Sequence, residues 1–560
     1  MADAPISSAD VQATFCATLV DEWARLGVTT AFVAPGSRST PVVLALANDD
    51  RIRMHVFHDE RSAAFAALGA GLRSGQPSVL VCTSGTAATH FHAAVVEADL
   101  AGVPLVVVTA DRPPELQGVG APQTIRQEHL YGAAAHWYHD PGVPRADENA
   151  TWRSVARRSV VEALRLPHGP VHVNLPFREP LVGTSGPLPP LVDEVFDART
   201  ERGLDSAVRR RLAETWSVRR PLLVAGRGTP DALVEAAQRC GWPVFAESRV
   251  RSVDSVVTHF DSLLRHAPFA DVDGPELVVR VGDPPASKVL GQWLLRHEVP
   301  QYHVSPDGRN YDPDRAIVER VVCEPGEITA MFEADIEPAD TAWSHRWSSA
   351  EARARTAVSN ALLAAGPMAG VHAVVTFGRS LPDDAAIVVS SSMPIRDLEW
   401  FSGPLGSRKV FSNRGANGID GVVATAIGVA ARHDGPVGVI VGDVAAIHDS
   451  SSLAALARRG LDVRILVVDN DGGGIFHHLP QRTILSDDVF ELLYGTPHGT
   501  DFVTLGAAHG IDGRAVGDRH ALMSAAQRPG PSLTVVRTDR EGDVAAHRTL
   551  HAAVAETLAD

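Results

Sequence analysis

Two oxygen-bearing side chains stand at the ends of two hydrophobic stretches, 27 residues apart. VGVIVGD (437–443) ends in Asp443, and DVRILVVDN (462–470) ends in Asn470. The stretch between them, HDSSSLAALARRG (448–460), is typical of a helix, so we expect a βαβ unit whose strands are parallel neighbours. Neighbouring strands lie about 4.8 Å apart. The carboxylate and the amide oxygen can therefore reach one hard cation such as Mg²⁺.

Three glycines follow this pair directly, in Asp471-Gly472-Gly473-Gly474. Glycines let a backbone approach a diphosphate closely, and the Gly472 carbonyl can supply a third ligand to the ion. Taken singly, Asp443 and Asn470 are most simply turn residues at strand ends. Together, the strand-end pair, its spacing and the glycines favour a site for Mg²⁺ and a diphosphate.

Gly442-Asp443 followed by Asp469-Asn470 resembles the cofactor motif of thiamine-diphosphate enzymes, which opens on Gly-Asp and closes on Asn-Asn. Val444 replaces the glycine that usually follows, and Asp469 replaces the first asparagine, but the ligand position is intact. The implied cofactor is thiamine diphosphate with Mg²⁺, or Mn²⁺ in its place. The implied metal ligands are Asp443, Asn470 and Gly472, and the implied diphosphate contacts also include Gly442 and Gly473.

Thiamine catalysis also needs a carboxyl group that shares a proton with the cofactor's pyrimidine ring. A glutamate in a low-dielectric setting, with a raised pKa, fits this role. Glu60 stands where a predicted strand meets an Ala-rich helix in RMHVFHDERSAAFAALGAG (53–71), and the resemblance implies that Glu60 is this residue. On position alone, it is a first-turn acid that complements the helix dipole. Ile419, between glycines in SNRGANGIDG (412–421), is implied as the apolar support that bends the cofactor.

Several segments resemble one family of thiamine enzymes closely, the 2-succinyl-5-enolpyruvyl-6-hydroxy-3-cyclohexene-1-carboxylate (SEPHCHC) synthases of menaquinone biosynthesis. The most specific segments are PGSRSTP (35–41), SNRGANGIDG (412–421) and GGIFHHLP (473–480). These transferases decarboxylate 2-oxoglutarate on thiamine diphosphate. The succinyl semialdehyde carbanion then adds to isochorismate, giving SEPHCHC and carbon dioxide. The resemblance implies the same reaction here.

Both substrates are dicarboxylates, so an acidic protein must supply a local cationic site, and arginine grips carboxylates bidentately. The implied substrate contacts are Ser37, Arg38, Arg112, Gln123, Lys288, Ser392, Arg396, Arg414, Ile475, Phe476 and Leu479. The implied catalytic set is Glu60, Ser392, Arg396 and Arg414. We expect Ser392 and Arg396 at the keto acid, whereas Arg38, Arg112, Gln123 and Lys288 face isochorismate, with the three apolar residues as its wall. For each basic residue, a solvated surface charge is the alternative.

Two other functions fit part of this pattern. An acetolactate-synthase-like carboligase, or another keto-acid decarboxylase, shares Glu60, Asp443 and Asn470 but does not need so many carboxylate-binding arginines. A catalytically silent protein that keeps the fold for ligand sensing or assembly does not need those three residues intact. Screening pyruvate against 2-oxoglutarate separates the first alternative, and an assay of carbon dioxide release separates the second.

Short β-branched stretches alternate with Ala-rich helical patterns along the whole chain. This alternation predicts an α/β protein with parallel sheets that are covered on both faces. A Pro- and Gly-rich stretch (179–194) and an acidic stretch (323–343) are interpreted as linkers. The resemblance implies three consecutive doubly wound parallel-sheet domains: a pyrimidine-binding domain (1–182), a structural middle domain (195–340) and a domain for diphosphate and Mg²⁺ (350–560).

The 560 residues include 51 Lys and Arg against 67 Asp and Glu, a formal net charge of −16. This balance argues against a general nucleic-acid or anionic-membrane binder. The four cysteines form no C-x-x-C pair and the N-terminus lacks an apolar leader pattern, so we expect a cytoplasmic protein. Because thiamine enzymes hold the cofactor between subunits, the resemblance implies a homodimer with shared sites, alone or paired into a homotetramer.

Overall fold

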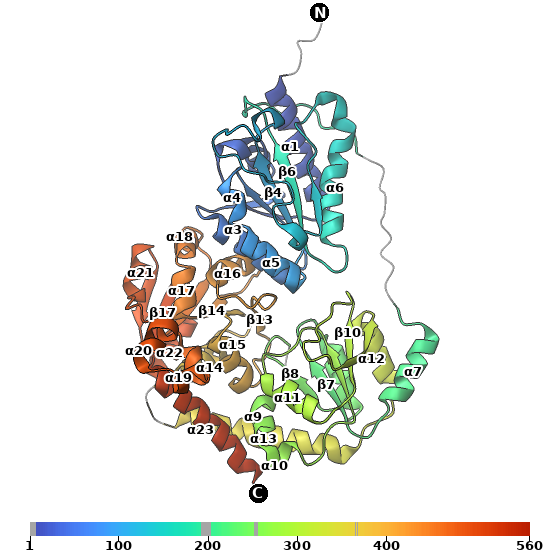
Figure 1. Cartoon of the computed structure of the whole chain (residues 1–560), viewed down its shortest axis with the longest axis vertical. Helices are drawn as coiled ribbons and strands as arrows, with labels where there is room; N and C mark the ends of the chain where they lie inside the picture. Colours follow the sequence, from blue (N-terminus) through green and yellow to red (C-terminus); the bar gives the residue numbers. More distant parts are fainter. Residues whose placement is uncertain (1–6, 192–202, 251–255, 365, 367, 560) are drawn as a thin grey trace, which may run out of the picture. The chain divides into compact units, whose positions relative to one another are not determined.

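The computed structural model describes residues 7–191, 203–250, 256–364, 366 and 368–559 (Figure 1). The first six residues, the end of the first predicted linker (192–194) and the predicted start of the middle domain at 195 lie outside these ranges. The described chain forms three β-sheets in sequence order, with helices packed on them. This arrangement confirms the predicted α/β class with three consecutive parallel-sheet domains, whereas the exact domain boundaries remain predictions.

The N-terminal sheet has six strands in the order β2-β1-β3-β4-β6-β5, and every neighbouring pair is parallel. Its strands are β1 (Thr30–Ala34), β2 (Arg53–Val56), β3 (Ser78–Cys82), β4 (Leu105–Asp111), β5 (Trp137–His139) and β6 (Pro170–Pro176). Alternate strand residues such as Val79 and Val81 share a hydrophobic core with α1 (Ser8–Arg25), α2 (Thr40–Ala47) and α6 (Trp152–Ala163). The other face is covered by α3 (Glu60–Ser74) and α5 (His92–Ala101).

The middle sheet has five parallel strands in the order β11-β10-β9-β7-β8. They are β7 (Pro221–Ala225), β8 (Val244–Ala246), β9 (Leu277–Val281), β10 (Gln301–Ser305) and β11 (Ile317–Val322). One core holds α7 (Ser206–Trp216), α8 (Asp231–Arg239) and α12 (Pro325–Ala334). The second core holds α9 (Phe260–Arg265), α11 (Lys288–Arg296) and α13 (Thr341–Leu363).

The second predicted linker, 323–343, is wrong, because this stretch contains α12 and the start of α13. Proline stands at the first position of α12, where its missing N–H costs nothing. Ile328, Met331 and Phe332 then recur on one helix face and are buried in the middle core. This apolar face outweighs the acidic composition that suggested a linker.

The C-terminal sheet has six strands in the order β13-β12-β14-β15-β17-β16. They are β12 (Ala386–Val389), β13 (Lys409–Phe411), β14 (Val437–Gly442), β15 (Val463–Asp469), β16 (Asp512–Ala515) and β17 (Ser532–Arg537). Its longer helices are α14 (Gly370–Ser380), α15 (Met393–Phe401), α16 (Val422–Ala430), α22 (Arg519–Gln527) and α23 (Arg540–Leu558). Its shorter helices are α17 (Asp443–His448), α18 (Ser451–Ala457), α19 (Gln481–Ile484), α20 (Asp487–Phe490) and α21 (Phe502–Ala508). β14 and β15 are neighbours, as the sequence predicts.

Among the described helices, none combines the length and the apolar character that crossing a bilayer requires.

The single helix predicted over 448–460 is wrong in its bounds. Asp443 is already the first residue of α17, and a second helix, α18, begins at Ser451. The break falls at Asp449, which is fully buried. Its carboxylate accepts hydrogen bonds from Ser452 Oγ at 2.6 Å and from Ala424 N at 2.9 Å. A side chain that bonds nearby backbone and hydroxyl donors competes with a continuous helix.

Packing divides the described chain into two compact units. The first unit holds the described residues up to 191 together with 413–437 and 445–463. In this unit α3 crosses α16 closely, because two glycines remove the side chains at the crossing. A Cβ on Gly69 would stand 2.0 Å from the Thr425 oxygen, and a Cβ on Gly428 would stand 1.8 Å from the Ala66 oxygen. The position of the helix that begins at Glu60 therefore depends on backbone-to-backbone contact.

We predict that Gly69→Ala lowers the thermal unfolding midpoint, because a methyl group there must displace backbone, a change that typically costs about 1–3 kcal/mol. Gly326→Ala in α12 is the control, since a Cβ at Gly326 would meet no atom within 4 Å. That variant should be neutral or more stable, because alanine favours a helix over glycine by about 1 kcal/mol. Equal unfolding midpoints for the two variants would contradict the prediction, because they would show that α3 and α16 can move apart at little cost in stability.

Candidate active site

The Asp443 carboxylate is buried where β14 ends, and backbone donors hold it in place. Its Oδ2 accepts hydrogen bonds from Asn470 N and Gly472 N, both at 2.9 Å, and its Oδ1 accepts one from Val444 N at 2.7 Å. Burial raises the pKa of Asp443, while the donors at Gly472 and Val444 act in the opposite direction. A carboxylate that is fixed but incompletely stabilised in this way suits a bound cation.

The neighbouring atoms fit a metal ion and a diphosphate. Within the described residues, Asn470 Oδ1 is buried and has no hydrogen-bond partner, so an oxygen ligand is left available next to Asp443. The Gly472 carbonyl accepts one hydrogen bond, from Gly474 N at 3.0 Å, and keeps a second lone pair. A Cβ on Gly442 would meet no atom within 4 Å, so the space beside this backbone is open.

The glycines after Asp471 serve the chain's own packing, which the sequence did not reveal. A Cβ on Gly472 would lie 1.8 Å from the Gly495 oxygen, and a Cβ on Gly473 would lie 2.0 Å from the Tyr494 oxygen. Gly473 N also donates to the Gly495 carbonyl at 2.8 Å. Gly472 has a φ of 136°, which a side chain tolerates poorly. Because they lack side chains, these glycines let the backbone of Tyr494 and Gly495 pack directly against the loop that holds Asp443.

Glu60 is the first residue of α3, at the predicted strand–helix junction. The preceding Asp59 caps the helix, because its Oδ1 accepts from Arg61 N at 2.9 Å, and its Oδ2 accepts from Ser451 Oγ at 2.6 Å. The Glu60 carboxylate is half-buried, and among the described residues it has no hydrogen-bond or ion-pair partner. Its anchored backbone and unpaired carboxylate fit a role toward a bound cofactor.

Two arginines of the N-terminal domain make hydrogen bonds to polar groups that follow its strands. Arg38 is buried and donates to the Phe177 carbonyl at 2.9 Å and to Glu179 Oε1 at 3.1 Å. Arg112 donates to Ser84 Oγ at 2.8 Å, and Ser84 Oγ in turn donates to the Gln123 carbonyl at 3.0 Å. Burial, followed by the positive charge of Arg112, lowers the pKa of Arg38. The structure thus brings together Arg38, Arg112 and Gln123, three of the predicted substrate residues.

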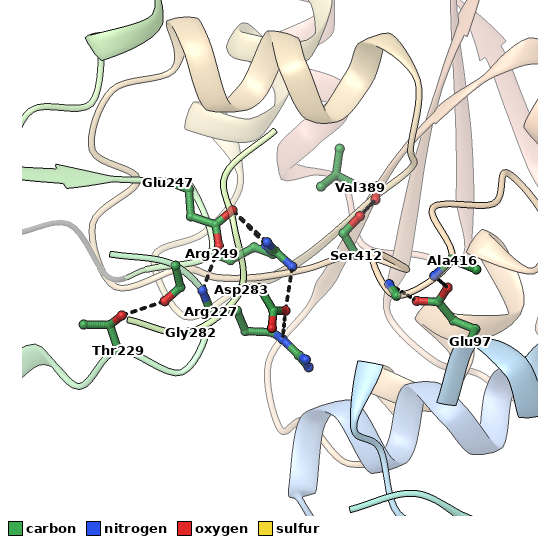
Figure 2. A network of polar contacts seen from close by, with 12 residues as sticks. Glu97, Arg227, Thr229, Glu247, Arg249, Gly282, Asp283, Val389, Ser412 and Ala416 are labelled. Atoms are coloured by element: carbon green, nitrogen blue, oxygen red, sulfur yellow. Dashed lines mark hydrogen bonds and ion pairs between the residues drawn. The ribbon is translucent and has the colours of Figure 1, made fainter. Parts of the chain in front are cut away.

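Ser392 and Arg396 lie together after β12, as the sequence predicts. Ser392 is the N-cap of α15 with a φ of 76°, and the Arg396 guanidinium donates to the Ser392 carbonyl. Burial lowers the pKa of Arg396. A purely structural role, in which Arg396 pairs with Asp397 or Glu399, is the alternative. Asp397 Oδ1 is 2.7 Å from His547 Nε2, while the negative charges of Glu399 and Asp397 both favour the charged form of Arg396. Ser412, which directly follows the neighbouring strand β13, donates from its Oγ to the carbonyl of Val389, the last residue of β12, at 2.8 Å (Figure 2).

The remaining predicted residues have simpler surroundings. Ile475 and Phe476 lie in a 3₁₀ turn, Gly474–His478, and Leu479 follows it. The Phe476 ring packs on Tyr494, with centroids 5.2 Å apart. Ser37 begins a 3₁₀ turn, Ser37–Ser39, and Ile419 is half-buried before α16. Lys288 is the exposed first residue of α11. A contact of any of these with substrate remains a prediction.

A buried network of charges lies beside the strands of the middle sheet. Arg249, with its side chain 1% exposed, is 2.8 Å from Glu247 Oε2 and 3.4 Å from Asp283 Oδ2, and Arg227 Nε donates to Asp283 at 2.7 Å (Figure 2). A Cβ on Gly226 would lie 1.7 Å from the Asp283 oxygen. Gly226, in the loop after β7, therefore lets this loop pack directly against the backbone of Asp283.

Comparison with known proteins agrees with this geometry along the whole chain. Residues 14–130 match the N-terminal TPP binding domain of thiamine pyrophosphate enzymes, residues 401–536 match their C-terminal TPP binding domain, and residues 198–388 match their middle domain. A 2-succinyl-5-enolpyruvyl-6-hydroxy-3-cyclohexene-1-carboxylate synthase from Myxococcus xanthus is 39% identical over 99% of this chain and 99% of its own. The chain belongs to the SEPHCHC synthase family. A second member, from Thermobifida fusca, is 40% identical over 96% of this chain and 98% of its own.

A solved structure shares the fold of this SEPHCHC synthase family member at lower identity. It is a thiamine diphosphate-dependent 4-hydroxybenzoylformate decarboxylase from Rhodococcus jostii RHA1, with a TM-score of 0.72. The two are 19% identical, and the match covers 94% of this chain and 99% of the other. At this identity the likeness shows the common fold alone.

Two supporting residues of this family member escaped the sequence analysis. Glu97 is buried in α5, and its carboxylate accepts from Gly415 N at 2.7 Å and from Ala416 N at 2.6 Å, next to Arg414 (Figure 2). His547 in α23 holds Asp397. Burial lowers the pKa of His547, but the charge and hydrogen bond of Asp397 outweigh burial and raise it. Neither stands out in the local sequence, because Asp99 follows two residues after Glu97 and Arg548 follows His547 directly.

We predict that two glycine substitutions in the cofactor loop separate binding from folding. Gly442→Ala should leave the melting temperature of the cofactor-free protein unchanged, because its methyl group meets no protein atom. It should weaken thiamine diphosphate binding by about tenfold, or about 1.4 kcal/mol, by filling the open space. Gly472→Ala should lower the melting temperature even without cofactor, because of its φ and its contact with Gly495. Calorimetry and thermal unfolding measure both effects, and a destabilised Gly442→Ala protein would contradict this assignment.

Proposed function

We propose that this chain is a transferase that decarboxylates 2-oxoglutarate and adds the remaining four-carbon unit to isochorismate. The products are SEPHCHC and carbon dioxide, and the reaction belongs to menaquinone biosynthesis. The observation that carries the proposal is the unpartnered Asn470 oxygen beside the buried Asp443 carboxylate, in a chain that is 39–40% identical to SEPHCHC synthases over nearly its full length.

In this proposal, Asp443, Asn470 and the Gly472 carbonyl hold Mg²⁺, with Mn²⁺ as a substitute ion. When bound, thiamine diphosphate would supply a carbanion that attacks the keto carbon and a cationic thiazolium ring that accepts the electrons released on decarboxylation. Glu60 would hold a proton at the pyrimidine nitrogen of the cofactor, and the absence of a partner for its carboxylate among the described residues supports this role. Ile419 supports the bent cofactor from the loop before α16. Gly442 and Gly473 line the diphosphate.

The arginines are proposed to hold the carboxylates of the two substrates. Arg396, with Ser392, is assigned to 2-oxoglutarate, and Arg414 is assigned to the same catalytic set. Arg38 and Arg112 are assigned to isochorismate, because two guanidinium groups near each other form a natural site for a dianion. Gln123, Ser37 and Lys288 are assigned to the polar side of the isochorismate site, with Ile475, Phe476 and Leu479 as its apolar wall.

The proposal is tested by measuring carbon dioxide release in the presence of Mg²⁺ and thiamine diphosphate. We expect turnover with 2-oxoglutarate, a new product in mass spectrometry only when isochorismate is added, and little turnover with pyruvate. Preference for pyruvate would favour an acetolactate-synthase-like or other keto-acid enzyme instead. No release with either acid would favour a protein that keeps the fold without catalysis. All four cysteines are buried free thiols, which supports a cytoplasmic location for the reaction.

We predict that Glu60→Gln keeps the fold and binds thiamine diphosphate but loses turnover. Glutamine preserves the shape of the side chain and cannot share a proton with the pyrimidine ring. Removing a general acid or base typically costs about 10²–10⁴-fold in rate. Glu128→Gln, at an exposed position of the same sheet domain, is the control. A near-normal kcat in Glu60→Gln would remove Glu60 from the mechanism.

The same variant tests the proposed assembly, a homodimer with shared sites that is either complete or half of a homotetramer. Glu60 and Asp443 belong to different sheet domains, so two subunits can each contribute one of them. Mixing inactive Glu60→Gln with inactive Asp443→Ala subunits should restore part of the activity, because one hybrid site keeps both residues. No rescue despite demonstrated subunit exchange, or a fully active monomer in sedimentation, would count against shared sites.

We predict that Arg396→Ala lowers kcat/KM for 2-oxoglutarate and leaves thiamine diphosphate binding nearly unchanged. Loss of one charge-assisted hydrogen bond costs about 1.5–3 kcal/mol, which is about 10- to 150-fold in specificity. Pyruvate lacks the second carboxylate, so its low turnover should change less. Arg458→Ala, at an exposed position, is the control. If Arg396→Ala loses thermal stability but keeps its specificity constant, Arg396 is structural and the carboxylate clamp lies elsewhere, with Arg414 as the next candidate.

A further inference from the structure

A histidine that the sequence did not single out, His498, lies beside the buried Asp443 carboxylate. Its Nε2 is 3.4 Å from Asp443 Oδ2, and its side chain is 15% exposed. This nitrogen is buried, and within the described residues it has no hydrogen-bond partner. Nδ1 accepts a hydrogen bond from Thr500 N at 3.0 Å. A neutral imidazole carries one proton, so acceptance at Nδ1 assigns the proton to Nε2, on the side of Asp443.

The segment that carries His498 is fixed against the cofactor loop by contacts on both sides. Asp471 Oδ1 accepts hydrogen bonds from His498 N at 2.9 Å and from Gly499 N at 2.8 Å. These backbone hydrogen bonds, that of Gly499 foremost, keep the pKa of Asp471 below its usual value. The imidazole ring also meets Phe502 edge-on, with centroids 5.7 Å apart. Asp471, in the turn whose backbone holds Asp443, therefore fixes the backbone of His498, and Phe502 and Thr500 contact its ring.

We propose that His498 is a positioning residue for the metal-binding carboxylate, donating from Nε2–H to Asp443 Oδ2. This inference rests on the proposed role of Asp443 as a metal ligand. Asp443 Oδ2 already accepts from Asn470 N and Gly472 N, whereas Oδ1 accepts only from Val444 N. With His498 as a third donor, Oδ2 would be surrounded by donors, and Oδ1 would be the oxygen left for a cation. Hydrogen bonding of this kind orients metal-binding carboxylates and tunes their affinity.

The distance of 3.4 Å is longer than a formed hydrogen bond, which is about 2.7–3.2 Å. The proposed hydrogen bond therefore requires Nε2 to lie slightly closer to Asp443 Oδ2 in the cofactor-loaded protein. Direct metal ligation by His498 is the competing possibility, because ligand atoms of Asp443, Asp469 and His498 lie within 4.8 Å of one another. Ligation needs a lone pair on Nε2. Because Nδ1 accepts from Thr500 N, the ring proton lies on Nε2, which leaves no lone pair there. The geometry therefore favours positioning.

The test compares His498→Phe and His498→Ala with an exposed control, His520→Ala in α22. Calorimetry measures thiamine diphosphate binding to the full-length protein at saturating Mg²⁺, and thermal unfolding measures the cofactor-free protein. We expect both His498 variants to weaken Mg²⁺-dependent binding by about 10- to 100-fold. Phenylalanine keeps the ring packing on Phe502, so the cofactor-free His498→Phe protein should melt like the wild type. His520→Ala should match the wild type in both measurements.

Two results would overturn the inference. Wild-type affinity in His498→Phe would show that only the ring packing matters, and this variant decides the question even if His498→Ala fails to fold. Loss of Mn²⁺ affinity with unchanged Mg²⁺ affinity in His498→Phe would make the imidazole a direct ligand, since imidazole ligation favours the softer ion. If the wild-type protein itself binds thiamine diphosphate without needing a divalent ion, the proposed metal site at Asp443 fails, and that outcome is distinct from either result for His498.

Discussion

A buried carboxylate held by backbone donors is the constraint on which the proposed metal site depends. Asp443 is 2% exposed, and a charge removed from water is costly unless hydrogen bonds and a counter-charge compensate. Its donors are backbone N–H groups of the turn at 470–472 and of Val444. That turn exists only because Gly472 adopts a φ of 136° and lies against the Gly495 carbonyl. The conformation that holds the charge is thus set by a second backbone segment.

A similar dependence on bare backbone positions the helix that begins at Glu60. Gly69 and Gly428 let α3 and α16 approach until each glycine lies against a carbonyl oxygen of the other helix. Gly421, just before α16, lies against the Phe65 ring. The loop with Arg414 and Ile419 enters α16 directly, and Glu97 fixes its backbone. Small residues and one buried acid therefore set the position of groups that are proposed to contact the cofactor and substrate.

The sequence predicted the strand ends and the residue types at them, because hydrophobic strands and polar ends are local patterns. It placed Asp443, Asn470, Glu60 and Ser392 correctly at element boundaries. It missed His498 and Ser84, because their partners come from distant segments and leave no local spacing. It also missed the helix break at Asp449, since that depends on the Ala424 N–H. The candidate contact residues could be proposed from the sequence, whereas the residues that hold them in place could be found only in the folded structure.

The treatment of charge differs between the proposed substrate arginines and the structural ones. Arg249 is 1% exposed and is paired with Glu247 and Asp283, so its charge is neutralised within the protein. Arg396 and Arg112 instead donate to neutral oxygens, the Ser392 carbonyl and the Ser84 hydroxyl. A neutral acceptor orients a guanidinium without cancelling its charge. Arg38 is intermediate, because it donates to the Phe177 carbonyl and also pairs with Glu179, whose 74% exposure makes that pair weak. In a chain with a net charge of −16, orientation by neutral oxygens leaves part of this positive charge available for a dicarboxylate, although the charges of Glu399 and Asp397 also act on Arg396.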